Sequence, residues 1–505
     1  MINKFSNLLL LLIIGCVFQN CSTSETTPDQ PNIILLMGDD HGWEETGYNG
    51  HAFLQTPVLD EMAASGLRMD NFYSASPVCS PTRGSVITGR HPNRYGTFTP
   101  NWSIRPEEIS VAQLLNKAGY QSGHFGKWHL GPVKASSPTS PGAMGFETWL
   151  SHDNFFEIDP VLSRNGAQPE KIEGESSMIL IDETIRFIEK AKSENKPFLA
   201  VVWFGSPHEP YQGLPEDLAL YENLPDSLSE YQVSLTSIET GRSTRRPLDS
   251  VLQERYAEIT AMDRAIGKLR SHLSQANLRD NTLLWYCGDN GIPGSGVFNT
   301  KLRAQKGAVY EGGIKVPGII EWPAGIPDPK ITKVNSVTSD ILPTLCTIAG
   351  QSLPNRPIDG INITPVFEGK MEMRSTPICF WDYETSHEMK YESKPYIDPE
   401  LQEGTTPLVK MMAGKYTRSF RNFHHPEIQQ EDYAGPKAIT DNQYKLVMHD
   451  DKDGAIRKEL FDLESDPYEQ VNLIDRHPEI AKGLENQIVA WQESVLRSLT
   501  GADYQ

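Results

Sequence analysis

The chain has 505 residues, and 38% of them are hydrophobic, which excludes a single small domain and predicts a fold with a large buried core. Its formal net charge of -20 argues against nucleic acid as a partner, because proteins that bind nucleic acid present a basic surface. A small anionic substrate stays compatible with this charge, provided that positive groups are concentrated locally in a cleft or at a metal ion.

The N-terminal residues 1–21 are expected to be an export signal rather than part of the fold. The apolar run Leu8–Phe18 follows a charged start and is too short to span a bilayer as a stop-transfer helix. Lipidation at Cys16 or Cys21 is expected, with simple cleavage as the alternative. Residues 22–31 would then be a polar tether. The mature protein is therefore predicted in the periplasm or at the cell surface, with a lipid anchor as its membrane contact.

Apolar strands and amphipathic helices alternate along the first part of the chain. Such alternation predicts an α/β sheet with helices on both faces, in which ligands bind beyond the carboxyl ends of the strands. We expect strands at 32–37, 198–204, 282–287 and 318–322, and helices over 178–188 and 256–273.

The alternation of strands and helices gives way to short strand-like segments near residue 376. Residues 32–375 are predicted to form the catalytic α/β domain, and residues 376–505 a smaller α+β domain with a short antiparallel sheet. Within the second part we expect short strands at 378–381, 410–412 and 444–448, and a last helix over 487–499. Polar or Pro-rich segments predict long loops at 131–142, 212–250, 391–407 and 421–436.

Polar side chains follow several predicted strands. Asp39 and Asp40 come after the first strand, and Asp289 and Asn290 follow the strand 282–287. Adjacent carboxylates repel each other unless a cation lies between them, and hard oxygen ligands favour calcium or magnesium over zinc. An isolated Asp-Asn-Gly is more often an ordinary turn, so the prediction depends on the two motifs occurring together.

The most specific motif begins at Cys79, where the sequence reads Cys-Ser-Pro-Thr-Arg and continues to Thr-Gly-Arg at residue 90. A lone cysteine in a Pro-rich loop of an exported protein indicates that the residue has a chemical role. On this motif the chain resembles the sulfatase family, in the branch of arylsulfatase A and N-acetylgalactosamine-6-sulfatase. The resemblance extends from about Asn32 to Leu473. It implies an alkaline-phosphatase-like sandwich, with a large mixed, mostly parallel sheet flanked by helices.

The resemblance also implies the chemistry of the site. Cys79 would be oxidised to formylglycine, whose hydrate supplies the nucleophile, by a formylglycine-generating or anaerobic sulfatase-maturating enzyme. One calcium ion would be held by the side chains that match the metal ligands of the family, namely Asp39, Asp40, Cys79, Asp289 and Asn290. Cys287, where the family usually has a small residue, is interpreted as a buried strand residue without a role.

Four further motif residues complete the expected catalytic set with Cys79 and Arg83. In an extended segment Lys127 and His129 would project to the same side. The resemblance assigns His208 to protonation of the leaving oxygen, His129 to the second proton transfer, and Lys306 to the sulfate. Lys315 stands where the family commonly has arginine, which puts only a supporting contact in doubt.

The substrate is expected to be a sulfated polysaccharide or its oligosaccharides, either an algal glycan such as ulvan or carrageenan or a glycosaminoglycan. Sugar subsites could involve residues of the variable segments, namely His152, Asp153, Trp381, His424 and His425. Two alternatives stay open. The same scaffold hosts phosphodiesterases and phosphonate hydrolases, and a lipoprotein without the modified cysteine could bind glycans without catalysis.

Overall fold

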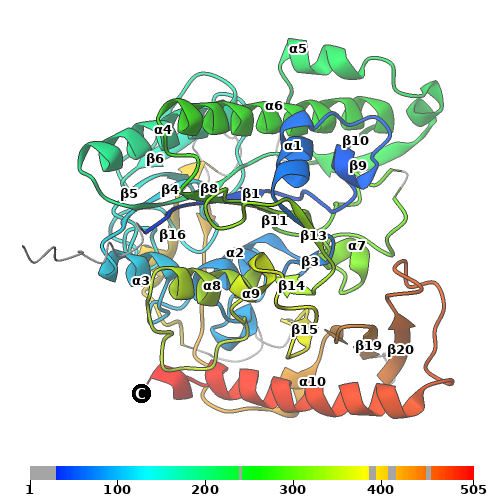
Figure 1. Cartoon of the computed structure of the whole chain (residues 1–505). Helices are drawn as coiled ribbons and strands as arrows, with labels where there is room; N and C mark the ends of the chain where they lie inside the picture. The colour runs from blue at the N-terminus through cyan, green and yellow to red at the C-terminus, as the bar shows by residue number, and fades with distance from the viewer. Residues whose placement is uncertain are drawn as a thin grey trace, which may run out of the picture.

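A ten-stranded sheet runs through the centre of the molecule, with helices above and below it (Figure 1). The computed structural model describes residues 30–237, 242–298, 300–385, 394–407, 417–450 and 456–504. The predicted signal segment 1–21 and nearly all of the tether lie outside these residues. Within the described residues, no helix combines the length and the apolar character that a membrane crossing requires.

The five central strands of the sheet run parallel to one another. They are, in spatial order, β11 (Thr282–Gly288), β1 (Asn32–Gly38), β8 (Phe198–Trp203), β4 (Gln121–Lys127) and β5 (Thr148–His152). The outer strands are β12 (Gly318–Glu321), β2 (Leu67–Met69) and β13 (Lys330–Thr332) beyond β11, and β6 (Val161–Arg164) and β7 (Glu170–Lys171) beyond β5. Antiparallel pairs join β11 to β12, β12 to β2, β5 to β6, and β6 to β7. The sheet is therefore mixed and mostly parallel, as predicted.

Alternating residues of the central strands pack into two separate cores. Ile33, Leu35 and Met37 of β1 join one buried cluster, and Ile34 and Leu36 join the other. The helices are α1 (Pro57–Ser65), α4 (Ser176–Ser193) and α6 (Leu248–Gln275) on one face, and α2 (Cys79–Thr88), α3 (Val111–Lys117), α8 (Ile341–Ile348) and α9 (Thr364–Phe367) on the other. The continuous apolar runs of the strands follow from this burial on both faces.

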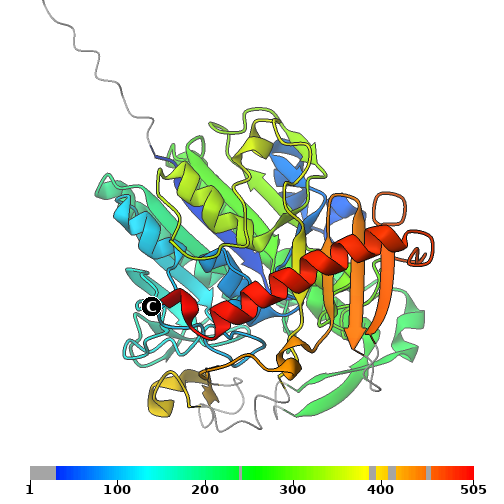
Figure 2. The ribbon, with the colours of Figure 1, turned by 90° about the horizontal axis from the view of Figure 1, so that it is seen from below.

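A smaller antiparallel sheet lies next to the second helical layer. Its strands are β15 (Ile378–Trp381), β18 (Lys437–Thr440), β19 (Tyr444–Asp450) and β20 (Ile456–Asp462). The long helix α10 (Pro478–Leu499) runs across one face of it, as Figure 2 shows, and buries Leu484 and Ile488 there. The short antiparallel sheet and the last helix thus agree with the prediction, while the boundary at 375/376 stays a prediction.

Some predictions about connecting segments were wrong. The expected loop 212–250 contains the short helix α5 (Pro215–Leu218), the hairpin of β9 (Gln232–Thr236) and β10 (Ser243–Pro247), and the start of α6. A second hairpin joins β16 (Glu403–Pro407) to β17 (Thr417–Ser419), partly within the expected loop 391–407. The strand predicted at 410–412 lies outside the described residues. Further short elements include the strands β3 (Phe72–Tyr73) and β14 (Ser336–Val337) and the helix α7 (Glu311–Ile314).

Candidate active site

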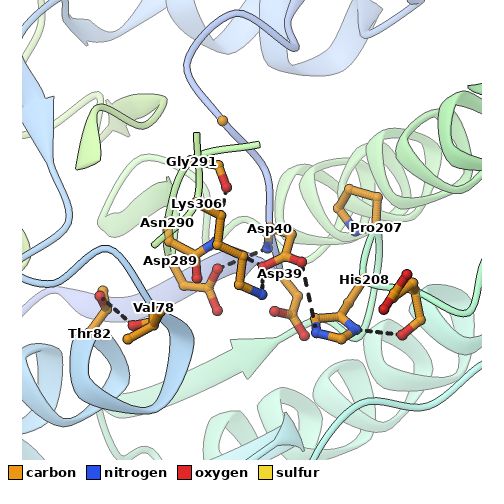
Figure 3. Close-up of polar contacts among 12 residues, drawn as sticks. Asp39, Asp40, Val78, Thr82, Pro207, His208, Asp289, Asn290, Gly291 and Lys306 are labelled. Carbon is orange, nitrogen blue, oxygen red and sulfur yellow. Dashed lines mark hydrogen bonds and ion pairs between the residues drawn. The ribbon is translucent and has the colours of Figure 1, made fainter. Parts of the chain in front are cut away.

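The carboxyl ends of β1 and β11 bring two predicted motifs together. These strands are adjacent and parallel, with Gly38 in register with Gly288, so the residues that follow them meet at one edge of the sheet. The backbone N–H of Asp40 donates to Asp289 Oδ1 at 2.9 Å, and Asn290 Nδ2 donates to Asp40 Oδ1 at 2.8 Å. Figure 3 shows these side chains facing one another.

Cys79 lies beside this group, as the first residue of helix α2 rather than in a loop. Its side chain is 1% exposed. The sulfur and carboxylate oxygens of Asp39 and Asp289 all lie within 4.8 Å of one another, and so do ligand atoms of Asp39, Asp40 and His208. Because the first N–H groups of a helix carry partial positive charge, this position suits chemistry on an anion.

Three cations neutralise the three carboxylates. Lys127, the last residue of β4, donates to Asp39 Oδ2 at 2.6 Å. Arg83 Nη2 donates to Asp289 Oδ2 at 2.6 Å, and Lys306 Nζ donates to Asp40 Oδ1. These contacts are charge-assisted hydrogen bonds. Lys306 is partly exposed, and the other five side chains are buried. The acidic protein therefore gathers three positive side chains at this one point, each paired with a carboxylate.

The crowding of charge shifts the pKa values of the carboxyls in opposite directions. Burial, followed by repulsion from Asp39, raises the pKa of Asp289 to about 6. Burial alone would also raise the pKa of Asp40, but Lys306, His208 and Lys127 bring it below its usual value. A divalent cation would relieve the repulsion between these groups.

The residues present fit a metal ion. Asp39 Oδ1 and Asn290 Oδ1 are buried and receive no hydrogen bond within the part of the chain described. Arg83 Nη2 is 3.5 Å from this Asp39 oxygen. Buried acceptors without a donor are costly, and a cation would satisfy both. An all-oxygen set of this kind is typical of hard divalent ions.

Two histidines line the same site. His129 has a φ of 56°, so the segment after Lys127 is not extended as the sequence predicted. Lys127 and His129 are nevertheless both buried at the site, and neither ring nitrogen of His129 has a hydrogen-bond partner among the described residues. Burial, followed by the nearby Lys127, lowers the pKa of His129 well below its usual value. The neutral ring is therefore the form ready to accept a proton.

His208 is oriented from two sides. Its Nδ1 contacts the carbonyl oxygen of Glu209, which makes Nδ1 the donor, and its ring stacks on Phe155 with centroids 4.6 Å apart. Its Nε2 lies 3.8 Å from Asp40 Oδ2 (Figure 3). Burial lowers the pKa of His208 well below its usual value. The Nε2 atom thus points at the acidic cluster.

Sequence reasoning missed Arg255, which supports the site from helix α6. Arg255 is fully buried and donates to the backbone carbonyls of Asp40 and Pro207, each at 2.6 Å, and to both carboxylate oxygens of Glu45. It therefore ties the loop after β1 to the loop that carries His208. The available signal was a charged residue on the apolar face of an amphipathic helix.

Three of the residues expected to line sugar subsites are buried instead. Trp381 is 1% exposed and packs in an aromatic cluster near α10. The Asp153 carboxylate accepts backbone N–H groups of Val133 and Thr406, each at 2.8 Å, and of Thr405. His152 is also buried. These side chains are structural and do not offer a surface to a sugar.

The comparison with known proteins decides the family. Residues 31–351 match the Sulfatase family. This chain belongs to the sulfatase family. The predicted family is thereby confirmed, and the sulfatase described here is a sulfuric ester hydrolase.

Individual relatives agree with this assignment. The sulfatase is 28% identical over 396 residues to N-acetylgalactosamine-6-sulfatase of Mus musculus, covering 70% of this chain and 69% of the relative. It is 29% identical over 358 residues to an ulvan-active sulfatase of Formosa agariphila, covering 68% of each chain. The crystal structure of Ps i-CgsB in complex with k-i-k-neocarrahexaose has a TM-score of 0.73 at 23% identity, over 92% of this chain and 93% of that one. The last likeness establishes the shared fold.

Proposed function

We propose that this sulfatase acts through formylglycine made from Cys79. The observation that carries the proposal is the position of the Cys79 sulfur within 4.8 Å of carboxylate oxygens of Asp39 and Asp289, at the start of helix α2. The sulfur stands in for the carbon-bound oxygens of the oxidised group. Burial raises the pKa of the unmodified thiol, so a thiolate is a poor candidate nucleophile at neutral pH. The hydrated aldehyde would supply one oxygen to attack sulfur and a second to release sulfate.

One calcium ion would be held by Asp39, Asp40, Asp289 and Asn290 together with the oxidised side chain at 79. Carboxylate and amide oxygens are the ligands that calcium takes in proteins. When bound, it would add a positive charge against the sulfate oxygens. The two buried acceptor atoms without donors, Asp39 Oδ1 and Asn290 Oδ1, support this ligand set.

The surrounding side chains would perform the binding and the proton transfers. Lys127 and Lys306 would hold the sulfate oxygens, and Arg83 would fix the group at position 79. His208, with Lys306, would protonate the departing sugar oxygen from the charged form of its ring, which the neighbouring Asp40 favours although burial opposes it. His129, whose ring nitrogens have no partner in the described part of the chain, would then accept the proton that allows sulfate to leave. Preorganised charge of this kind usually contributes the largest share of the rate.

The substrate would be a sulfated polysaccharide or its oligosaccharides, and an algal glycan is favoured. Support comes from the relative named as ulvan-active and from the similarly folded protein bound to a carrageenan-type hexaose. The N-terminal pattern supports export to the periplasm or cell surface, with lipidation at Cys16 or Cys21. A maturating enzyme would modify Cys79 during biogenesis. Residues 32–375 would form the catalytic domain and 376–505 the smaller domain.

The mass of the peptide that contains Cys79, measured with sulfate release from defined sulfated oligosaccharides, tests the proposal. The oxidised mass and sulfate release should occur together. A matched phosphodiester substrate separates sulfate-ester from phosphoester hydrolysis. Faster turnover of the phosphodiester, or sulfate release by a preparation with only unmodified Cys79, would refute the proposal.

The His208→Ala variant tests the assigned proton donor. It should lose about 10²- to 10⁴-fold in kcat while its melting temperature and calcium affinity stay those of the wild type. His272→Ala on the outer part of helix α6 is the matched control, because His272 is partly exposed and pairs with Glu189. A wild-type rate in His208→Ala would contradict the role.

A further inference from the structure

The β16–β17 hairpin is fastened to the end of strand β5. Asp153, which follows that strand, accepts the backbone N–H groups of Thr405 and Thr406, and its own N–H donates to Thr406 Oγ1 at 3.0 Å. Strand β5 is the neighbour of β4, which ends in Lys127. The hairpin is therefore held next to the strand end that supplies a cation of the active site.

Arg418 on this hairpin lies at the edge of the active site. Its Nη1 donates to Asn101 Oδ1 at 2.8 Å, and its guanidinium carbon is 5.6 Å from the ring centroid of Phe155. Phe155 in turn stacks on the ring of His208. A single aromatic ring thus separates the guanidinium from the predicted proton donor.

Arg418 has no carboxylate partner among the residues that the structure describes. Its Nε is buried, and no hydrogen-bond partner lies within the described part of the chain. Burial lowers the pKa of Arg418 below its usual value, and the nearby Cys79 opposes this shift. Lys127, Arg83 and Lys306, in contrast, each pair with an acid of the cluster. A half-buried guanidinium without a counter-ion is poorly compensated until an anion binds.

We propose that Arg418 binds a second anionic group of the substrate, a sulfate or a carboxylate, carried near the sulfate ester that is hydrolysed. This inference rests on the proposed action on sulfated sugars and narrows it to substrates with two acidic groups. The planar fork of arginine matches the oxygens of either group.

Arg418→Gln and Arg418→Lys, made in the full chain with modified Cys79, test this assignment. Three substrates are compared: 4-nitrophenyl sulfate with one anionic group, a disulfated disaccharide, and a monosulfated disaccharide that contains a uronate. Arg418→Gln should lower kcat/KM for a substrate with two acidic groups by about 10- to 100-fold, mainly through KM. The lysine variant should recover part of this loss. Arg497→Gln is the control: it removes an exposed charge of helix α10, and its kcat/KM on all three substrates should equal that of the wild type.

The outcomes separate the subsite from a structural role. An equal loss on all three substrates, or the same KM for the doubly charged substrates in wild type and Arg418→Gln, would overturn the assignment. Of the two doubly charged substrates, the one whose kcat/KM falls more in Arg418→Gln identifies the second group as sulfate or carboxylate. Calorimetric titration with the disulfated disaccharide needs no turnover and should show about tenfold weaker binding by Arg418→Gln. If sulfate is never released while this difference in binding persists, the proposed function fails and the anion subsite stands.

Discussion

At the scale of single residues, Arg255 determines how two loops of the active site sit. Its guanidinium is the buried partner of Glu45 and also donates to two loop carbonyls. Removing one member of a buried ion pair leaves the other charge uncompensated, which costs more than the pair itself contributes.

We therefore expect Arg255→Met to lower the free energy of unfolding by about 3–5 kcal/mol and to reduce activity, because the loops after β1 and β8 lose their link. Urea unfolding of the single variants and of Arg255→Met combined with Glu45→Gln measures the coupling. The double variant should recover part of the stability but not the activity, since the two carbonyls stay unpaired. Strict additivity of the two losses would contradict this account.

Asp263 provides a pH-dependent contact between two helices. Its carboxylate, in α6, accepts the backbone N–H groups of Val58 and Leu59 at the start of α1, at 3.0 and 2.8 Å. Burial raises the pKa of Asp263 to about 7, against these two hydrogen bonds. A folded-state pKa above the unfolded value near 3.8 means that this group's contribution is complete below that value and decreases as the pH rises through about 7.

The Asp263→Asn variant tests this sign. The wild type should lose stability between pH 5 and pH 8 through this group, whereas the variant, which does not titrate there, should show a flatter profile. Because asparagine has one acceptor oxygen in place of two, the variant should be less stable than the wild type at pH 5. This gap in stability between the two proteins should narrow at pH 8. Melting temperatures across this range measure the gap. A gap that widens with pH would show that the charged carboxylate is the stabilising form.

At the scale of elements, the strand ends of the site were predictable and the segments around them were not. A continuous apolar run that stops at Gly38 or Gly288 identifies a buried strand, and adjacent parallel strands must bring their following residues together. The left-handed backbone at His129 depends on contacts made after folding, so residue spacing gave the wrong geometry there. Arg418 lies in a polar segment without periodicity, and only tertiary contacts bring it near His208.

Asp153 holds the β16–β17 hairpin, and its loss should loosen that element alone. In Asp153→Ala the N–H groups of Val133, Thr405 and Thr406 lose their shared acceptor. Buried donors without a partner favour local opening. Hydrogen exchange should therefore accelerate in the hairpin by about tenfold or more, while β1 and β11 keep their protection. Equal acceleration in the central strands would show that Asp153 supports the whole fold.

At the scale of the whole molecule, helix α10 joins the small antiparallel sheet to the loops that carry Arg94 and Asp359. The Asp359 carboxylate accepts two hydrogen bonds from Arg94, at 2.7 and 2.8 Å, and one from Trp491 of α10 at 2.8 Å. Arg94 also donates to Ser494 and Ser498 on the same helix. Figure 2 shows α10 extending beyond the small sheet. One partly buried acid, Asp359, thus links elements that are far apart in the sequence.

Asp359→Asn should weaken this link and reveal whether the molecule unfolds as one unit. Burial opposes ionisation of Asp359, but Arg94 holds its pKa below the usual value, so its contribution is present at neutral pH and is lost as the pH falls below about 4. The substitution leaves Arg94 without its charged partner, and we expect the free energy of unfolding at pH 7 to fall by about 3–5 kcal/mol, with a smaller difference at pH 3. Tryptophan fluorescence and far-ultraviolet circular dichroism should still report one coincident transition in urea, because α10 also packs its apolar face on the small sheet. Separate transitions for the two probes would show instead that Asp359 is what makes the docking of α10 cooperative with the rest of the fold.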